Sequence, residues 1–472
     1  MAETQVAGST ASGATIADSD VQAFAKGFGG QVLTPESSSY DEARSIWNAM
    51  IDKKPRIIAR CTSTEDVVMA VRFAKNHNLL LAVRGGGHNI AGNATCDDGM
   101  VIDLSQMKTV KVDAAAMTAT SQPGALLADF DKATAEHGLA TPLGINSTTG
   151  IAGLTLGGGF GWISRKFGLT IDNLIEAEIV TATGEVVKAS ATQNADLFWG
   201  IRGGGGNFGI ATSFTYRLHK VGPEIFSGLI VHPFSEAKKL LTFYREFTKT
   251  LPDDVTVWVV MRKAPPLPFL PEEWHGKEVL VFAAACAGDP DAGAKALQPL
   301  RDFGKPIADV MGMNPLAGWQ QAFDPLLTPG MRNYWKSHDF NELADGLIDE
   351  ITKAIGTLPS PHTEIFIAQM GGATSRAVAD SSAFGERSMP FLINVHGRWE
   401  TAAEDANGVK WCRAFYDAGT PYATGGVYVN FMTADETDRI KSAYGKNYDR
   451  LVELKRKYDP TNLFRLNQNI KP

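Results

Sequence analysis

The sequence places a histidine at the end of a glycine turn, in the run Arg84-Gly85-Gly86-Gly87-His88-Asn89. Three consecutive glycines carry no side chains, so their backbone N–H groups can come close to a phosphate. Arg84 could place a fixed positive charge beside it. His88 adds a titratable, nucleophilic ring that a phosphate cradle does not require. The turn is therefore either an ordinary tight turn with an incidental histidine or a nucleotide-binding turn whose histidine does chemistry.

Two further glycine-rich segments follow. Residues 143–161 contain seven glycines in nineteen residues, each of which would cost a helix or strand about 1 kcal/mol. Such a segment persists if something must approach its backbone, as a planar cofactor with a pyrophosphate would. Residues 204–209 form a literal GxGxxG, but a dinucleotide fold needs a strand before it and a helix after it. Here an alternating strand, 210–218, comes after the motif, which argues against that fold. No GxxxxGK[ST] occurs, so a P-loop is unsupported.

Hydrophobic periodicity predicts the elements that must position these segments. A helix over 63–78 begins at a capping box formed by Thr62 and Glu65, and a short apolar strand follows it before the glycine turn. Further along, the expected elements are strands at 100–104 and 109–112, a helix at 126–137 ended by Gly138, and a hairpin over 174–190 that turns at Thr183-Gly184.

From about residue 221 the pattern changes. Strand-like runs at 255–261 and 278–285 alternate with helical stretches such as 339–355, which predicts an antiparallel sheet with helices on one face and an α+β fold class. Near the end, 427–431 has strand character, and 442–457 has helical character up to Asp459-Pro460.

Composition limits the functional classes. A chain of 472 residues with 44% hydrophobic residues has two or three domains' worth of core. A formal charge of −7 argues against nucleic acid as a partner. No apolar run approaches the roughly 20 residues that span a membrane, and residues 1–20 lack the features of a signal peptide. The four cysteines form no metal-ligand pattern. We expect a cytoplasmic protein without a metal site.

The helix–strand–RGGGH order, the GGGFG loop, the LFWGIRGGGGNFG loop and the ending 462–470 together resemble the VAO/PCMH-type FAD-linked oxidoreductases, in their berberine-bridge-enzyme-like branch. The resemblance covers nearly everything from residue 20 onward. It implies the first part of an FAD-binding domain over 21–219, a substrate-binding domain over 220–435, and a segment over 436–472 that returns to the FAD-binding domain. Residues 1–20 are rich in Ala, Ser, Thr and Gly, which predicts a flexible tail.

The resemblance implies contacts with FAD along all three glycine segments and near the C-terminus. The implied residues are Arg84, Gly85, Gly86, Gly87, His88, Asn89 and Gly92; Asn146, Ser147, Thr148, Gly150, Gly153, Gly157, Gly158, Gly159, Gly161 and Trp162; Gly206, Asn207, Gly209 and Ile210; and Tyr428 and Asn430. In the family, a histidine at the place of His88 often carries the flavin through its 8α-methyl carbon. The cysteine that forms a second tether in many members aligns with Asn146, so this chain resembles the singly linked members.

The resemblance also suggests catalytic residues. The position that controls access of dioxygen to the flavin falls on Thr149, whose compact side chain favours an oxidase over a dehydrogenase. Tyr428 is the predicted proton acceptor, within a Tyr-x-Asn strand whose geometry points Tyr428 and Asn430 the same way. Glu364, Gln369 and His396 lie in strand-like runs of the second domain and are further candidates on the substrate side.

These observations predict an FAD-dependent oxidase that transfers a hydride from a substrate carbon, the CH–OH of an alcohol, sugar or secondary metabolite, to covalently bound flavin, with O2 as acceptor giving H2O2. Oxidation of a C–N bond, a dehydrogenase with another acceptor, a non-redox use of the flavin and a nucleotide-binding module without flavin are the alternatives. The expected partners are a small-molecule substrate and O2, with no nucleic acid or membrane, for a monomer or homodimer.

Overall fold

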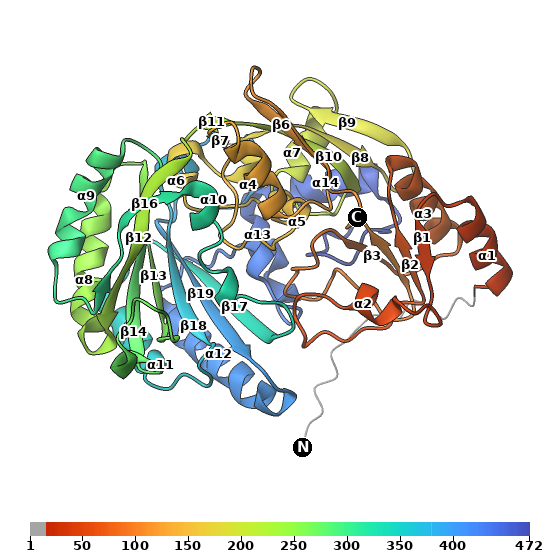
Figure 1. Ribbon diagram of the computed structural model, residues 1–472. Helices are drawn as coiled ribbons and strands as arrows, with labels where there is room; N and C mark the ends of the chain where they lie inside the picture. Colours follow the sequence, from red (N-terminus) through yellow and green to blue (C-terminus); the bar gives the residue numbers. More distant parts are fainter. Residues whose placement is uncertain (1–15, 379) are drawn as a thin grey trace.

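The computed structural model describes residues 16–378 and 380–472 (Figure 1). A large sheet with its helices occupies one side of the molecule, and two smaller sheets occupy the other. Of the tail predicted over 1–20, residues 1–15 lie outside the described residues. The prediction is wrong for the remainder, because Ile16 is buried and helix α1 (Asp18–Gly27) already begins there.

The first small sheet has the strand order β1 (Gln31–Leu33), β2 (Ile57–Arg60), β4 (Met100–Asp103) and β3 (Leu81–Arg84), with β2 and β3 parallel to β4. The short helix α2 (Tyr40–Arg44) lies beside β2. Helix α3 (Thr64–Asn76) packs its apolar stripe, which includes Val67 and Val71, into the same core. Its cap differs from the prediction by one residue: the Ser63 hydroxyl accepts the Asp66 N–H, and Asp66 accepts in turn from Thr62.

The second small sheet is antiparallel and has five strands, in the order β5 (Val110–Asp113), β6 (Thr118–Ser121), β10 (Ile210–Arg217), β8 (Leu174–Val180) and β9 (Val186–Ser190). The predicted hairpin over 174–190 is confirmed, with Gly184 at a φ of 75°. The helices of this part are α4 (Leu127–Ala135), α5 (Ile151–Leu156), α6 (Ser164–Phe167) and α7 (Ala195–Ile201). The short strands β7 (Leu139–Ala140) and β11 (His219–Lys220) pair with each other.

The large sheet is antiparallel and has eight strands. The order is β15 (Ala308–Asp309), β12 (Glu224–Pro233), β14 (Glu278–Cys286), β13 (Val255–Lys263), β18 (Glu364–Gln369), β19 (Phe391–Trp399) and β17 (Arg332–Phe340), with β16 (Gly312–Pro315) also paired to β12. The predicted helix over 339–355 starts late, because Asp339 and Phe340 belong to β17.

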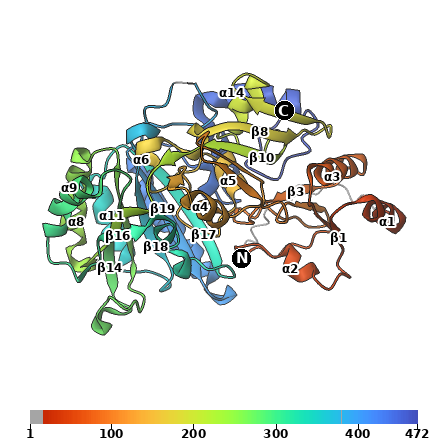
Figure 2. The same ribbon diagram turned by 45° about the horizontal axis from the view of Figure 1, so that its top comes forward.

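Helices cover one face of this sheet, as expected for an α+β fold. They are α8 (Ala237–Phe247), α9 (Pro290–Asp302), α11 (Asp345–Ile355) and α12 (Asp405–Gly419). Figure 2 shows α8, α9 and α11 on the side of the sheet away from the five-stranded sheet. Alternation along β13 serves both faces: Val257 and Val259 pack against the helices, whereas Trp258 and Val260 face the other way. The short helix α10 (Leu316–Trp319) lies beside β12 and β16.

The C-terminal part differs most from the prediction. The strand expected over 427–431 is a 3₁₀ turn, Val429–Phe431, with Tyr428 at its N-cap. The helix expected over 442–457 is interrupted at Gly445, whose φ is 51°, and forms α13 (Ile440–Tyr444) and α14 (Tyr448–Tyr458). The last residues return to the first part of the chain, as predicted, because buried Asn207 bonds the backbone of Gln468 and Ile470.

Candidate active site

A cavity of about 340 Å³ separates the glycine segments from the uncovered face of the large sheet. One wall comes from the three glycine segments, and the other from β13, β17, β18 and β19. Most of the predicted site residues line it: Gly85, Gly86, Gly87, His88, Asn89, Asn146, Thr149, Gly150, Gly153, Trp162, Gly206, Gly209, Ile210, Glu364, His396, Tyr428 and Asn430. The structure therefore brings together residues that lie more than 300 positions apart in the chain.

The glycines that line the cavity have two different roles. Gly86 and Gly150 meet backbone to backbone, since a Cβ on Gly86 would lie 2.4 Å from the Gly150 nitrogen. By contrast, a Cβ on Gly153 or Gly206 would meet nothing within 4 Å. Both of the latter border the cavity, so their missing side chains leave room for a ligand close to the backbone.

Other predicted contact residues do not line the cavity: Arg84, Gly92, Ser147, Thr148, Gly157, Gly158, Gly159, Gly161, Asn207 and Gln369. Several of these glycines serve packing instead. A Cβ on Gly157 would lie 2.3 Å from the Asn430 side chain, and one on Gly161 would lie 1.8 Å from the Leu143 carbonyl oxygen. Ser147 bonds Asp324 instead, because its backbone N–H and its hydroxyl both donate to the Asp324 carboxylate.

Arg84 does not lie where a phosphate-binding charge was expected. Its guanidinium donates to the Ala43 carbonyl and does not reach the cavity. A different arginine lies close to the histidine. Buried Arg398, from β19, holds its guanidinium carbon 5.1 Å from the centre of the Trp47 ring, and Trp47 stacks on His88 with ring centres 5.0 Å apart. Nothing in the local sequence around 398 predicted this.

His88 faces the cavity rather than bulk water. Burial lowers its pKa to about 3, an effect that a hydrogen bond to the Thr148 backbone opposes and that Arg398 reinforces. The Nε2 atom lies 3.1 Å from the Thr148 hydroxyl oxygen. That hydroxyl donates its own proton to Asn146 Oδ1 at 2.7 Å, so it must accept from His88 Nε2–H. Because its pKa is about 3, the ring is neutral at neutral pH, and a proton on Nε2 leaves the lone pair on Nδ1.

Glu364 and His396 meet on the opposite wall. They are directly paired across β18 and β19, and His396 Nδ1 lies 3.1 Å from Glu364 Oε1. The other carboxylate oxygen accepts from Arg262 Nη1 at 2.8 Å. Burial alone would raise the pKa of Glu364, but Arg262 and His396 outweigh it and lower the pKa to about 2. Burial lowers the pKa of His396, although Glu364 opposes this.

Gln369 does not belong to the site. Its Oε1 accepts the Val257 N–H at 2.9 Å, and its Nε2 donates to the Thr248 carbonyl at 3.4 Å. Since both ends of the amide are used by the backbone and the residue does not line the cavity, the prediction of a catalytic role for Gln369 is wrong.

Tyr428 and Asn430 do point the same way, but through a turn rather than a strand. The Tyr428 oxygen accepts two hydrogen bonds, from the Gly159 N–H at 3.0 Å and from Asn430 Nδ2 at 2.8 Å. Burial nevertheless raises the pKa of Tyr428 to about 12. At neutral pH the residue is therefore a phenol that keeps its proton.

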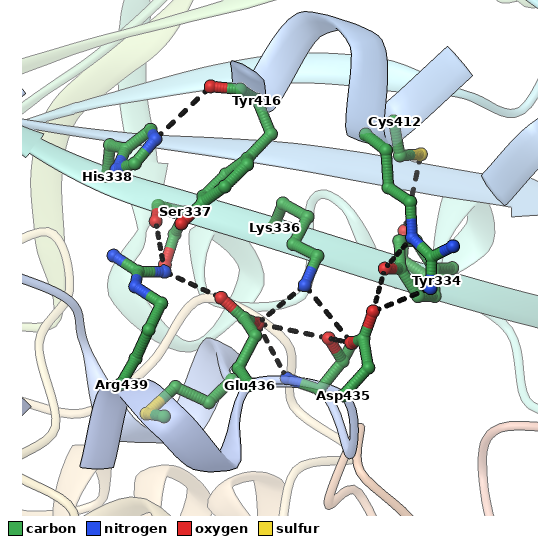
Figure 3. Close-up of polar contacts among 12 residues, drawn as sticks. Tyr334, Lys336, Ser337, His338, Cys412, Tyr416, Asp435, Glu436 and Arg439 are labelled. Carbon is green, nitrogen blue, oxygen red and sulfur yellow. Dashed lines mark hydrogen bonds and ion pairs between the residues drawn. The ribbon is translucent and has the colours of Figure 1, made fainter. Parts of the chain in front are cut away.

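A charged network fixes the chain that follows Asn430 against β17 (Figure 3). Buried Lys336 lies 3.1 Å from Asp435 and 3.4 Å from Glu436. Tyr334 donates to Asp435 at 2.6 Å, and Arg439 pairs with Glu436 at 2.6 Å. The network ties the turn that carries Tyr428 to the strand that carries Trp335, another cavity residue.

Several residues that line the cavity have a buried polar atom without a hydrogen-bond partner among the described residues: Trp162 Nε1, Trp335 Nε1, Asn394 Oδ1, His396 Nε2 and Asn467 Oδ1. Buried polar groups are usually paired, so these atoms are suited to a polar ligand. FAD fits the chemistry of the cavity, because its ring combines flat apolar area with N–H and carbonyl groups and its pyrophosphate suits glycine backbone. Asn394 could have been predicted, since alternation on β19 puts it on the face of His396.

Comparisons with known proteins agree with this geometry. The model of an FAD binding domain matches residues 55–190, and the berberine and berberine-like model matches residues 427–471. An FAD-linked oxidoreductase of Dictyostelium discoideum is 32% identical over 458 residues, which cover 96% of this chain and 97% of that protein. The chain belongs to the berberine bridge enzyme-like branch of the VAO/PCMH-type FAD-linked oxidoreductases.

Solved structures of this family share the fold. The 6-hydroxy-D-nicotine oxidase of Arthrobacter nicotinovorans superposes with a TM-score of 0.85 at 27% identity, covering 94% of this chain and 98% of that one. A chitooligosaccharide oxidase has a TM-score of 0.84 at 26% identity, covering 96% and 99%. This berberine bridge enzyme-like protein is therefore an FAD-dependent oxidoreductase with the family's α+β fold.

Among residues 16–378 and 380–472, none of the helices is both long and apolar enough to cross a membrane. No cluster of three or more His, Cys, Asp or Glu residues that could hold a metal ion occurs in the part of the chain that the structure describes.

Proposed function

We propose that this protein is an FAD-dependent oxidase that removes a hydride from the CH–OH carbon of a small aromatic alcohol, with FAD bound covalently to His88 and O2 as the final acceptor. Bound FAD would supply the two-electron acceptor. The observation that carries the proposal is the neutral His88 ring at one wall of the glycine-lined cavity, opposite a wall that holds unpaired polar groups.

The environment of His88 favours a single covalent link through Nδ1. The Asn146–Thr148–His88 chain of hydrogen bonds leaves the proton on Nε2 and the lone pair on Nδ1. No hydrogen-bond partner of Nδ1 is found within residues 16–378 and 380–472. Asn146, which stands where other members have a tethering cysteine, thus orients the histidine instead of holding the flavin itself.

Thr149 supports O2 as the acceptor. Its compact side chain lines the cavity next to Gly150, where the family's control of dioxygen access is expected. A larger side chain there would narrow the path to the cofactor.

The sheet wall supports an aromatic substrate. Trp258, Val260, Trp335 and Phe366 all line it, and Phe431 approaches from the adjoining turn. Such a wall offers broad apolar contact beside its unpaired polar groups, which suits a flat ring that carries a hydroxyl group. Oxidation of a C–N bond is the second candidate, because (R)-6-hydroxynicotine oxidase of Paenarthrobacter nicotinovorans is 29% identical to this chain over 466 residues.

The test uses the holoenzyme under argon with benzyl alcohol, 6-hydroxynicotine and chitobiose as separate probes. We expect benzyl alcohol to bleach the flavin absorbance, and air to restore it with formation of H2O2. Bleaching by 6-hydroxynicotine alone would select the second candidate. Bleaching that air does not reverse would show a dehydrogenase, and no bleaching by any probe would contradict a redox function on these substrate classes.

A further inference from the structure

We propose that His396 Nε2 is the group that accepts the substrate's hydroxyl proton, and that Glu364, itself held by Arg262, is the positioning residue that keeps His396 in the accepting tautomer. The proposal rests on the proposed function for the hydride. It replaces Tyr428 as the proton acceptor.

The geometry of the strand pair fixes the tautomer. Glu364 Oε2 accepts from Arg262, so the carboxylate is ionised and its Oε1 can only accept from His396 Nδ1. The Nδ1 atom therefore carries the proton of the neutral ring. This leaves the lone pair on Nε2, a buried atom without a partner among the described residues, on a side chain that lines the cavity.

The surroundings of His396 suit a hydroxyl group. Trp335, paired with His396 across β17 and β19, packs edge-on against it with ring centres 4.3 Å apart. Trp335 also lines the cavity, and its buried Nε1–H has no partner among the described residues. A substrate hydroxyl could accept from Trp335 Nε1–H while it donates to His396 Nε2. Asn394, on the same face of β19, offers a further acceptor in its Oδ1.

The charged groups around His396 keep the ring neutral until the reaction. Glu364 comes from β18, Arg262 from β13 and Arg398 from β19 itself. The facing residue of β17, Trp335, is uncharged, and so is Phe431 of the 429–431 turn, which packs on Trp335. The pKa of His396 is lowered by burial, so Nε2 is unprotonated at neutral pH. When Nε2 takes a proton, the adjacent carboxylate stabilises the imidazolium.

Tyr428 is less suited to this task. Its pKa of about 12 means that it holds its proton at neutral pH, and its oxygen already accepts two hydrogen bonds. It can donate to a ligand, but it cannot readily take a second proton.

The step is balanced. The substrate O–H bond breaks and its proton goes to His396 Nε2. The C–H bond would break with its electron pair, which bound FAD would accept as a hydride, and the carbon–oxygen double bond would form. The alcohol is oxidised by two electrons to a carbonyl compound. The proton on His396 is released to solvent after the product leaves.

The first test needs no substrate. Long-range 1H–15N correlation spectra of the holoenzyme labelled in its histidines, with His396→Gln to assign the signal, report the tautomer and pKa of His396. We expect the Nδ1–H tautomer at neutral pH, a pKa below the ordinary value of about 6.5, and a further fall in that pKa in Glu364→Gln. A cationic ring, or the Nε2–H tautomer, would overturn the proposal whatever the substrate is.

The second test measures anaerobic flavin reduction by benzyl alcohol across pH. A positioned base contributes about 10²–10⁴-fold in rate, so His396→Gln should lose that factor. In the parent, the rate should fall as pH drops through the pKa of His396, and this fall should vanish in the variant. His338→Gln, at a buried histidine of β17 that bonds Tyr416 and Thr420 outside the cavity, is the matched control and should keep the parent profile.

The positioning role has its own readout. Glu364→Gln removes the charge, and Arg262→Met with Glu364→Gln removes both charges together, so that no buried ion is left unpaired. Both should lower kcat more than they raise KM for benzyl alcohol. The proposal is overturned if the rate of anaerobic flavin reduction in His396→Gln stays within about threefold of the parent rate. It is also overturned if Glu364→Gln changes neither the pKa of His396 nor kcat. If no alcohol reduces the flavin of the parent protein, the proposed function is contradicted instead.

Discussion

Replacing Gly153 by alanine should separate fold stability from cofactor binding. Gly153 lies in helix α5 without a positive φ, and a Cβ there meets no atom within 4 Å. Alanine is favoured over glycine inside a helix by about 0.5–1 kcal/mol, so the fold should be unharmed or slightly more stable. The new methyl group, however, occupies the side of the cavity where we place FAD, and overpacking of this kind costs about 1–3 kcal/mol.

The assay uses a His88→Ala background, in which FAD cannot be linked and its affinity can be measured by titration. With the overpacking cost above, Gly153→Ala in this background should bind FAD about 5- to 150-fold more weakly than the background protein does. The melting temperature of the flavin-free variant should not fall. Gly312→Ala, at another glycine with no atom near its Cβ but outside the cavity, is the matched control. If Gly153→Ala binds FAD as tightly as the background does, the cofactor does not pass over α5, and the reasoning from the glycines is refuted.

Three further predictions follow from the same cavity. Thr149→Leu should slow reoxidation of the reduced flavin by air while anaerobic reduction stays largely intact; equal effects on both half-reactions, measured by stopped flow, would remove Thr149 from the oxygen path. Tyr428→Phe should lower anaerobic reduction by only about 2- to 13-fold, the worth of one neutral hydrogen bond, and keep the decline at low pH; a loss of 10²-fold or more would restore Tyr428 as the base. The pKa of Glu364 is about 2 in the folded protein against 4.5 unperturbed, so its ionised form stabilises the fold above pH 4.5, and this contribution is lost as pH falls from 4.5 towards 2. The melting temperature should therefore decline less steeply over that pH range in Glu364→Gln than in the parent. Equal slopes of melting temperature against pH in the two proteins would contradict the lowered pKa of Glu364.

Local patterns predicted the elements whose apolar residues repeat regularly. The hairpin over 174–190 was predictable because its alternation matches the two-residue period of a strand, and the strands 255–261 and 278–285 were predictable because they are short, largely apolar runs. The run 427–431 alternates in the same way, yet it forms a 3₁₀ turn. There Asn430 donates to the Leu154 carbonyl and to Tyr428, and such tertiary contacts override a local preference.

The site was predictable in its parts but not in its pairings. The sequence indicated His88, the glycines, Glu364 and His396 as candidates. That Glu364 lies opposite His396 depends on the register between two strands whose residues are 32 positions apart, and composition does not specify that register. The direction of Arg84 and the placement of Arg398 over Trp47 likewise depend on packing between distant segments.

The central claim is that a flavin is attached to His88. Acid precipitation of the holoenzyme, proteolysis and mass spectrometry of the yellow peptide test it most directly. We expect the yellow colour to stay with the precipitate and the mass of FAD to lie on the peptide that contains His88. NMR of that peptide should show attachment at Nδ1. In His88→Ala, the colour should be released into the supernatant. Release of the colour from the parent protein, or a flavin on any other residue, would contradict the account.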